Sequence, residues 1–144
     1  MELPDRQKIA IKKISQKFGL VLMLQFGSSI EENNIYLHKE SDIDIAFLSD
    51  NKDFSFKQLI NLQYELAKIF SVFEDKIDLV NLRNASSLLG RKIADSSIIL
   101  YDFDHHQFNQ FYIYAQKRYI EEKDIYELEN HYLKQKISRR SYAR

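Results

Sequence analysis

Two apolar runs, separated by a polar stretch that carries paired aspartates, constrain the fold of this chain more than any other feature. Residues 20–26 are apolar except for Gln25, as expected of a strand covered on both faces. This run ends in Gly27-Ser28-Ser29, and a polar connector leads to a second apolar run that begins at Asp42-Ile43-Asp44. The pattern predicts two buried strands, with a turn after the first and carboxylates at the start of the second.

The paired aspartates are placed for metal binding. Side chains two residues apart in a strand point to the same face, so Asp42 and Asp44 project together and Ile43 faces the other side. Adjacent carboxylates repel each other unless a cation lies between them. Mg²⁺ takes oxygen ligands of this kind, usually one or two carboxylates with water and phosphate oxygens. The spacing therefore favours a magnesium site.

A third carboxylate and a polar turn extend this pattern. Asp78 interrupts the apolar run of residues 76–82, where burial without a partner is costly. The turn Gly27-Ser28-Ser29 offers backbone N–H groups and hydroxyls to an anion. A Gly-Ser after a strand is usually a simple turn, and alternating charges are common on surface strands. Together, however, the three aspartates and the turn favour a nucleotidyl-transfer site.

These residues resemble the nucleotidyltransferase fold of the DNA polymerase β superfamily. Within it, the chain is most similar to the minimal nucleotidyltransferases, the MntA-type antitoxins that accompany HEPN toxins. The family pattern is Gly-Ser, a connector, Asp-x-Asp and a later Asp, here Gly27-Ser28, Asp42-Ile43-Asp44 and Asp78. The likeness covers roughly residues 21–101. The connector, residues 29–41, is longer than is usual in the family and lacks the Arg and Gly that commonly follow Gly-Ser.

The resemblance implies a fold and an activity. The fold is α/β (α+β), a small mixed sheet flanked by helices with a long C-terminal helix. The activity is transfer of AMP from ATP to a tyrosine of a cognate HEPN ribonuclease toxin, which neutralises the toxin. The implied catalytic residues and ligands of two Mg²⁺ ions are Asp42, Asp44 and Asp78. The implied ATP-binding residues are Gly27, Ser28 and Ser29.

Two other functions remain open. A non-catalytic antitoxin would mask its toxin through the C-terminal helix, and the altered connector suits that role. A small-molecule nucleotidyltransferase of the aminoglycoside-modifying kind is the other, although such enzymes generally add a helical domain for which this chain has little room. A labelled-ATP reaction with the product of the neighbouring gene distinguishes the three.

The apolar periodicity predicts alternating helices and strands in one domain, with a core over about residues 5–103 and a helical extension over residues 104–144. The first expected elements are a helix opened by Pro4-Asp5 and closed at Gly19, followed by strands over 20–26 and 42–48. A helix over 56–70, a strand over 76–82, a helix capped by Asn84 and a strand over 97–101 come next. The last element is a helix over 105–140, which is either continuous or broken near 121–124.

The composition limits which kinds of site, partner and cellular location we expect for this chain. The chain has 144 residues, no cysteine and zero formal net charge. Disulfides and zinc–thiolate sites are therefore excluded, and bulk charge does not favour nucleic acid as a direct substrate. No apolar run approaches the ~18 residues of a membrane span, and the N-terminus lacks a signal-like apolar region. We expect a cytoplasmic protein without membrane contact.

The C-terminal helix carries more aromatic residues than one packed face needs. Eight Phe or Tyr lie between Phe108 and Tyr142, and five basic residues with no acidic one follow from Lys134 to Arg144. Tyrosine hydroxyls that reach water and a solvated helix end account for this pattern without a partner. Exposed aromatic residues are also typical of protein interfaces. We expect this helix to contact a partner.

Overall fold

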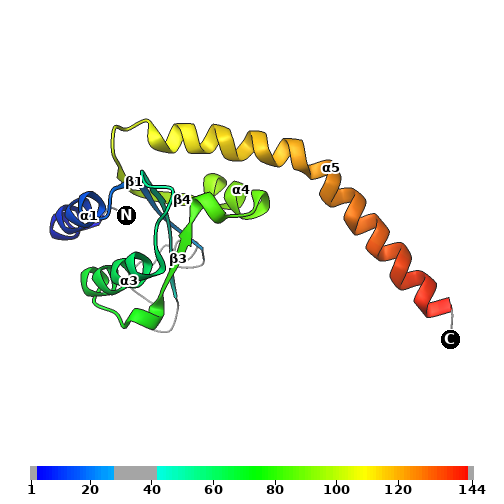
Figure 1. Ribbon diagram of the computed structural model, residues 1–144, viewed down its shortest axis with the longest axis horizontal. Helices are drawn as coiled ribbons and strands as arrows, with labels where there is room; N and C mark the ends of the chain where they lie inside the picture. Colours follow the sequence, from blue (N-terminus) through cyan, green and yellow to red (C-terminus); the bar gives the residue numbers. More distant parts are fainter. Residues whose placement is uncertain (1–2, 28–41, 143–144) are drawn as a thin grey trace.

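The computed structural model describes residues 3–27 and 42–142, and its elements follow the predicted order (Figure 1). They are α1 (Asp5–Lys17), β1 (Leu20–Phe26), β2 (Ile43–Ser49), α3 (Phe56–Phe70), β3 (Ile77–Asn81), α4 (Ser87–Asp95), β4 (Ser97–Asp102) and α5 (Gln107–Tyr142). Short 3₁₀ turns, η1 (Glu74–Lys76) and η2 (Leu82–Asn84), flank β3 and trim the predicted strand at both ends.

The four strands form one mixed sheet in the order β3-β2-β1-β4. Strand β1 is antiparallel to both β2 and β4, whereas β2 and β3 are parallel. A parallel pair needs a crossover connection, and α3 supplies it. Helices α1 and α3 lie on one face of the sheet, and α4 lies on the other with the first half of α5 (Figure 1). The prediction of a small mixed sheet flanked by helices is confirmed.

Each face of the sheet has its own apolar core. On the α1 and α3 side the buried residues are Ile11, Ile14, Leu20, Met23, Ile45, Phe47, Leu62, Leu66, Ala67 and Ile77. On the α4 and α5 side they are Leu22, Leu24, Phe26, Ala46, Leu82, Ile93, Ala94, Phe111 and Ala115. The alternation along each strand thus decides which side chains meet which pair of helices.

The helix ends follow local chemistry. Ser55 and Gln58 form a reciprocal capping box at the start of α3. The predicted cap of α4 was wrong: Asn84 lies in η2, and Ser86 accepts the backbone N–H of Leu89 at 3.2 Å. Gly19 follows α1 with φ +67°, in agreement with its predicted role at the helix end.

Helix α5 is one continuous helix of 36 residues that bends as it leaves the domain (Figure 1). Near the bend, the Tyr126 hydroxyl lies 2.6 Å from Ser87 Oγ in α4 and donates to Glu122 at 3.1 Å. About two turns earlier, Arg118 donates to the carbonyl of Ala85 at 2.8 Å. These polar contacts hold the middle of α5 on the start of α4.

Beyond Tyr126 the helix leaves the domain. We call residues 127–139 the α5 arm, and every side chain in it is exposed. The arm is nevertheless rich in apolar side chains, among them Leu128, Tyr132, Leu133 and Ile137, which are 53–68% exposed. Within the ranges that the structure describes, none of the helices combines the length and hydropathy that crossing a bilayer requires.

Candidate active site

Two of the predicted site residues, Asp44 and Asp78, meet at one end of the sheet. Asp44 in β2 pairs with Asp78 in β3 on one side and with Phe26 in β1 on the other. Phe26 in turn pairs with Ser97 at the start of β4. One row across the sheet therefore carries Ser97, Phe26, Asp44 and Asp78, and it brings together two carboxylates that lie far apart in the sequence.

Both carboxylates face the α4 side of the sheet. In β2, Ile45 packs with α1 and α3, whereas Ala46 packs with α4 and α5. Side chains alternate along a strand, so Asp44 shares the face of Ala46. In β3, Ile77 belongs to the α1 and α3 core, which puts Asp78 on the same face as Asp44. The parallel pairing of β2 and β3 and their common alternation set this arrangement.

The charges around Asp44 oppose its ionisation. Burial raises the pKa of the Asp44 carboxyl, and the negative charges of Asp78 and then Asp42 raise it further. Lys92 of α4 lowers the pKa of the same carboxyl. Asp42, immediately before β2, and Asp78 are exposed, whereas Asp44 is half-buried. A cation held among these three carboxylates would relieve their repulsion.

Gly27 closes the site on the β1 side. Its φ is +85°, and a Cβ built on it would overlap Oδ2 of Asp44 and lie 3.0 Å from Cγ. The end of β1 thus approaches the carboxylate so closely that a side chain at Gly27 would displace it. The other two predicted ATP-binding residues, Ser28 and Ser29, lie outside the described residues, as does the rest of the connector.

The donor set suits magnesium in its chemistry. Asp42, Asp44 and Asp78 supply only carboxylate oxygens, which are the ligands that Mg²⁺ takes. Within residues 3–27 and 42–142, no three Asp, Glu, His or Cys side chains lie close enough together to form a finished metal site. Asp42 and Asp78 are exposed and can change rotamer, so a cation would draw them toward Asp44.

Lys92 is a site residue that the sequence reasoning missed. It lies near the end of α4, the helix that leads into β4 and so to the row of Asp44. No motif marks it, because a lysine in the last turn of a helix is expected from the helix dipole alone. The charge of Lys92 acts on Asp44 only because α4 packs on the sheet, and this packing is not visible in the sequence.

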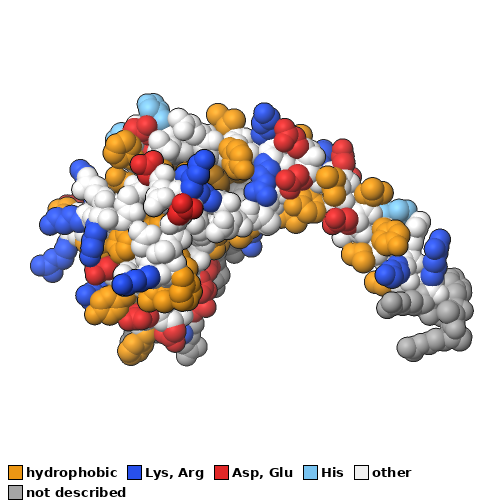
Figure 2. Space-filling view, viewed as in Figure 1, with side chains coloured by type: hydrophobic (Ala, Val, Ile, Leu, Met, Phe, Trp, Pro, Cys, Tyr) orange, Lys and Arg blue, Asp and Glu red, His pale blue; other side chains and the backbone are white. Residues whose placement is uncertain are grey.

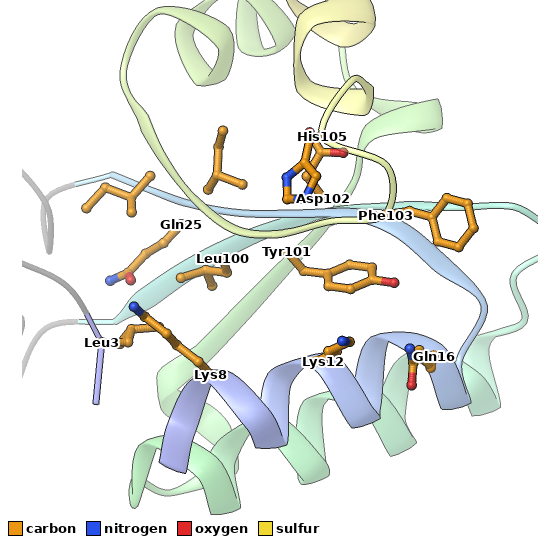
Figure 3. Close-up of a pocket in the computed structure, with 12 residues that line it drawn as sticks. Leu3, Lys8, Lys12, Gln16, Gln25, Leu100, Tyr101, Asp102, Phe103 and His105 are labelled. Atoms are coloured by element: carbon orange, nitrogen blue, oxygen red, sulfur yellow. The ribbon is translucent and has the colours of Figure 1, made fainter. Parts of the chain in front are cut away.

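A separate cavity lies elsewhere among the described residues. It measures about 610 Å³ and lies between α1 and β4, where Lys8 and Lys12 face Tyr101 and Gln25 (Figure 3). Gln25 points to the opposite side of β1 from Phe26, its neighbour in the row of Asp44. The sheet therefore separates this cavity from the carboxylates, and the cavity is not part of the candidate active site.

Comparison with known proteins agrees with this geometry. The model of the family described as "Polymerase beta, Nucleotidyltransferase" matches residues 8–106, which include the whole sheet and all three aspartates. A curated relative, the protein adenylyltransferase MntA of Aphanizomenon flos-aquae (strain 2012/KM1/D3), is 24% identical over 115 residues. That alignment covers 76% of this chain and 75% of the relative.

Solved structures share the fold. A chain from a crystal structure of a toxin–antitoxin with AMP-PNP matches with a TM-score of 0.63 and 25% identity, covering 83% of this chain and 95% of that one. A tri-AMPylated Shewanella oneidensis HEPN toxin in complex with an MNT antitoxin contains a chain that matches with a TM-score of 0.59 and 23% identity. That match covers 85% of this chain and 94% of the other.

Proposed function

The chain belongs to the polymerase β nucleotidyltransferase family, and from that membership we propose that it is an antitoxin that transfers AMP from ATP to a tyrosine of a cognate HEPN toxin. The observation that carries the proposal is the row in which Asp44 and Asp78 lie side by side, with Gly27 closely against Asp44. The adenylyltransferase relative and the AMP-PNP structure support the choice of ATP and of a toxin as the acceptor.

The proposed reaction is a single displacement. The tyrosine oxygen attacks the α-phosphorus of ATP and forms the new P–O bond. The bond between that phosphorus and the bridging oxygen to the β-phosphate breaks, so pyrophosphate leaves with the oxygen. The phenolic proton passes to Asp78 and then to water. No oxidant or further reactant is needed, and the AMP group stays on the toxin.

Positioning is the main task of the protein in phosphoryl chemistry. Asp42 and Asp44 would hold the metal and so fix the position of the triphosphate, and Asp78 would serve the nucleophile on the β3 side. Gly27, with Ser28 and Ser29, holds the terminal phosphates at the end of β1. When two Mg²⁺ ions are bound by these carboxylates, they supply neutralisation of the phosphate charge and activation of the attacking oxygen.

The α5 arm supports a role for docking. Its outer half descends on the side of the sheet that α4 covers, which is also the side of Asp44 and Asp78 (Figure 1). Figure 2 shows open space between the arm and the body of the domain, with apolar side chains along the arm. Exposed apolar clusters of this kind mark protein contacts. A toxin held by the arm would present its tyrosine to the carboxylates.

Leu133→Asp tests this docking role. Leu133 is 53% exposed in the arm, so the substitution leaves the domain core untouched. It puts a charge into the proposed interface, and we expect toxin affinity, measured by calorimetry, to fall about 10-fold or more. Affinity for MgATP should not change.

The matched control is Ser138→Asp, which adds the same charge to an exposed position of the arm that is already polar. This variant should bind toxin like the unmodified protein. If Leu133→Asp bound toxin with unchanged affinity, the arm would have no part in docking, and the AMP-transfer proposal would stand without it.

A masking antitoxin is the competing function, and the exposed arm is the observation that favours it. Isotope labels separate the two. With ATP labelled at the α-phosphate, Mg²⁺ and toxin, an adenylyltransferase puts label on the toxin, whereas ATP labelled at the γ-phosphate leaves the toxin unlabelled. Inhibition of the toxin without covalent label would support masking and contradict AMP transfer.

A further inference from the structure

We propose that Lys92 of α4 binds the β- and γ-phosphates of ATP, and therefore acts on the leaving-group side of the site. The inference rests on the proposed nucleotidyl-transfer function and adds a substrate-binding residue from an element that carries none of the recognised motifs.

The position of Lys92 follows from the packing of α4. Its neighbours Ile93 and Ala94 are 0% and 5% exposed and pack with Phe26 and Ala46 on the carboxylate face of the sheet. The helix ends at Asp95, and β4 then starts at Ser97, which pairs with Phe26. The last turn of α4 therefore lies at the end of the sheet where Asp44 lies.

The cations of this turn differ in their engagement. Arg91 stacks on the ring of Tyr119, with its guanidinium carbon 4.0 Å from the ring centroid, and its Nε lies 3.5 Å from Asp95. That ion pair lies within α4 and lacks hydrogen-bond geometry, so the stacking on Tyr119 is the contact that holds Arg91 toward α5. Lys92 is exposed, and no ion pair or side-chain hydrogen bond to another described residue engages its ammonium group. It is the cation of the turn left for a ligand.

The order of the strands decides on which side of Asp44 the end of α4, and with it Lys92, lies. Asp78 lies on the β3 side of Asp44, whereas Gly27 and the end of α4 lie on the β1 and β4 side. In an in-line displacement the nucleophile and the leaving group occupy opposite sides of the phosphorus. If Asp78 serves the nucleophile, Lys92 lies with Gly27 beside the departing pyrophosphate.

The charges around Asp44 also favour a phosphate-binding role for Lys92. Among the described residues, Lys92 supplies the positive charge that acts on Asp44, against the negative charges of Asp42 and Asp78. Divalent cations at the carboxylates would repel the ammonium group and release it from this role. Its long, flexible side chain can then reach an anion that arrives with the metal, and phosphate is a favoured partner of lysine.

The test compares nucleotides that differ only in phosphate number. Calorimetric titrations with MgATP and with AMP are made on the unmodified protein, Lys92→Gln and Lys92→Arg. Loss of a charge-assisted contact should weaken MgATP binding about 10- to 100-fold in Lys92→Gln. AMP affinity should be unchanged in this variant, and Lys92→Arg should retain most of the MgATP affinity.

Lys57→Gln is the control, because Lys57 is exposed on α3, which packs on the opposite face of the sheet. It should bind MgATP normally. Equal weakening of AMP and MgATP by Lys92→Gln, or no weakening of either, would overturn the assignment of Lys92. Absence of MgATP binding by the unmodified protein would instead overturn the proposed function, so the two failures are distinguishable.

Discussion

We expect replacement of Asp42 and Asp44 together by asparagine to abolish AMP transfer and to leave the fold intact. The two carboxylates are the residues that would hold both metal ions, so we expect a loss on the order of 10³-fold or more. Transfer of label from α-labelled ATP to the toxin measures the activity. Undiminished transfer by the double variant would contradict the assignment of both aspartates.

Thermal melting of the same variant tests the electrostatics without any substrate. The pKa of Asp44 is raised in the folded protein by burial and by the charges of Asp78 and Asp42. The folded state therefore binds the Asp44 proton more tightly than the unfolded chain does, and stability falls as the pH rises through the raised pKa. At neutral pH and without metal, the asparagine variant should melt at the same or a higher temperature.

Gly27→Ala is expected to have the second large effect, on both stability and activity. The positive φ of Gly27 costs a residue with a side chain about 1–2 kcal/mol. The new Cβ would also overlap the Asp44 carboxylate and force it to move. We expect weaker MgATP binding and severely reduced transfer, in addition to a lower free energy of unfolding in urea.

Gly19→Ala separates these two consequences. Gly19 has a similar positive φ of +67°, but a Cβ added there meets nothing within 4 Å. This control should lose stability for the same backbone reason and keep its nucleotide binding and transfer rate. If both variants kept full activity, the close approach of Gly27 to Asp44 would have no catalytic role.

Periodicity was sufficient to predict most of the fold. The apolar runs of β1 and β2 and the helical spacing in α3 each specify one element, because burial on one or two faces leaves a direct pattern in the sequence. The ends of the helices and strands are harder to predict. Asn84 and Ser86 are both good caps, and the choice between them depends on where β3 turns into η2. One continuous α5 in place of two helices depends on contacts with α4.

The candidate site is likewise predictable from the sequence only in part. The sequence motifs predict Asp44 and Asp78 as site residues, since a carboxylate in an apolar strand is conspicuous. Their pairing depends on the parallel register of β2 and β3, which no local pattern contains. Lys92 has no local signal at all, because its relation to Asp44 arises only when α4 packs on the sheet. Charges brought in by tertiary packing are what sequence reasoning missed.

The central claim is that this protein modifies its toxin covalently. Toxin incubated once with the protein and MgATP is separated from it, assayed for ribonuclease activity and weighed by mass spectrometry. We expect the separated toxin to stay inactive and to be heavier by whole AMP units located on tyrosine, whereas the Asp42→Asn and Asp44→Asn double variant leaves it unmodified. Return of ribonuclease activity on separation, with an unchanged toxin mass, would contradict the claim.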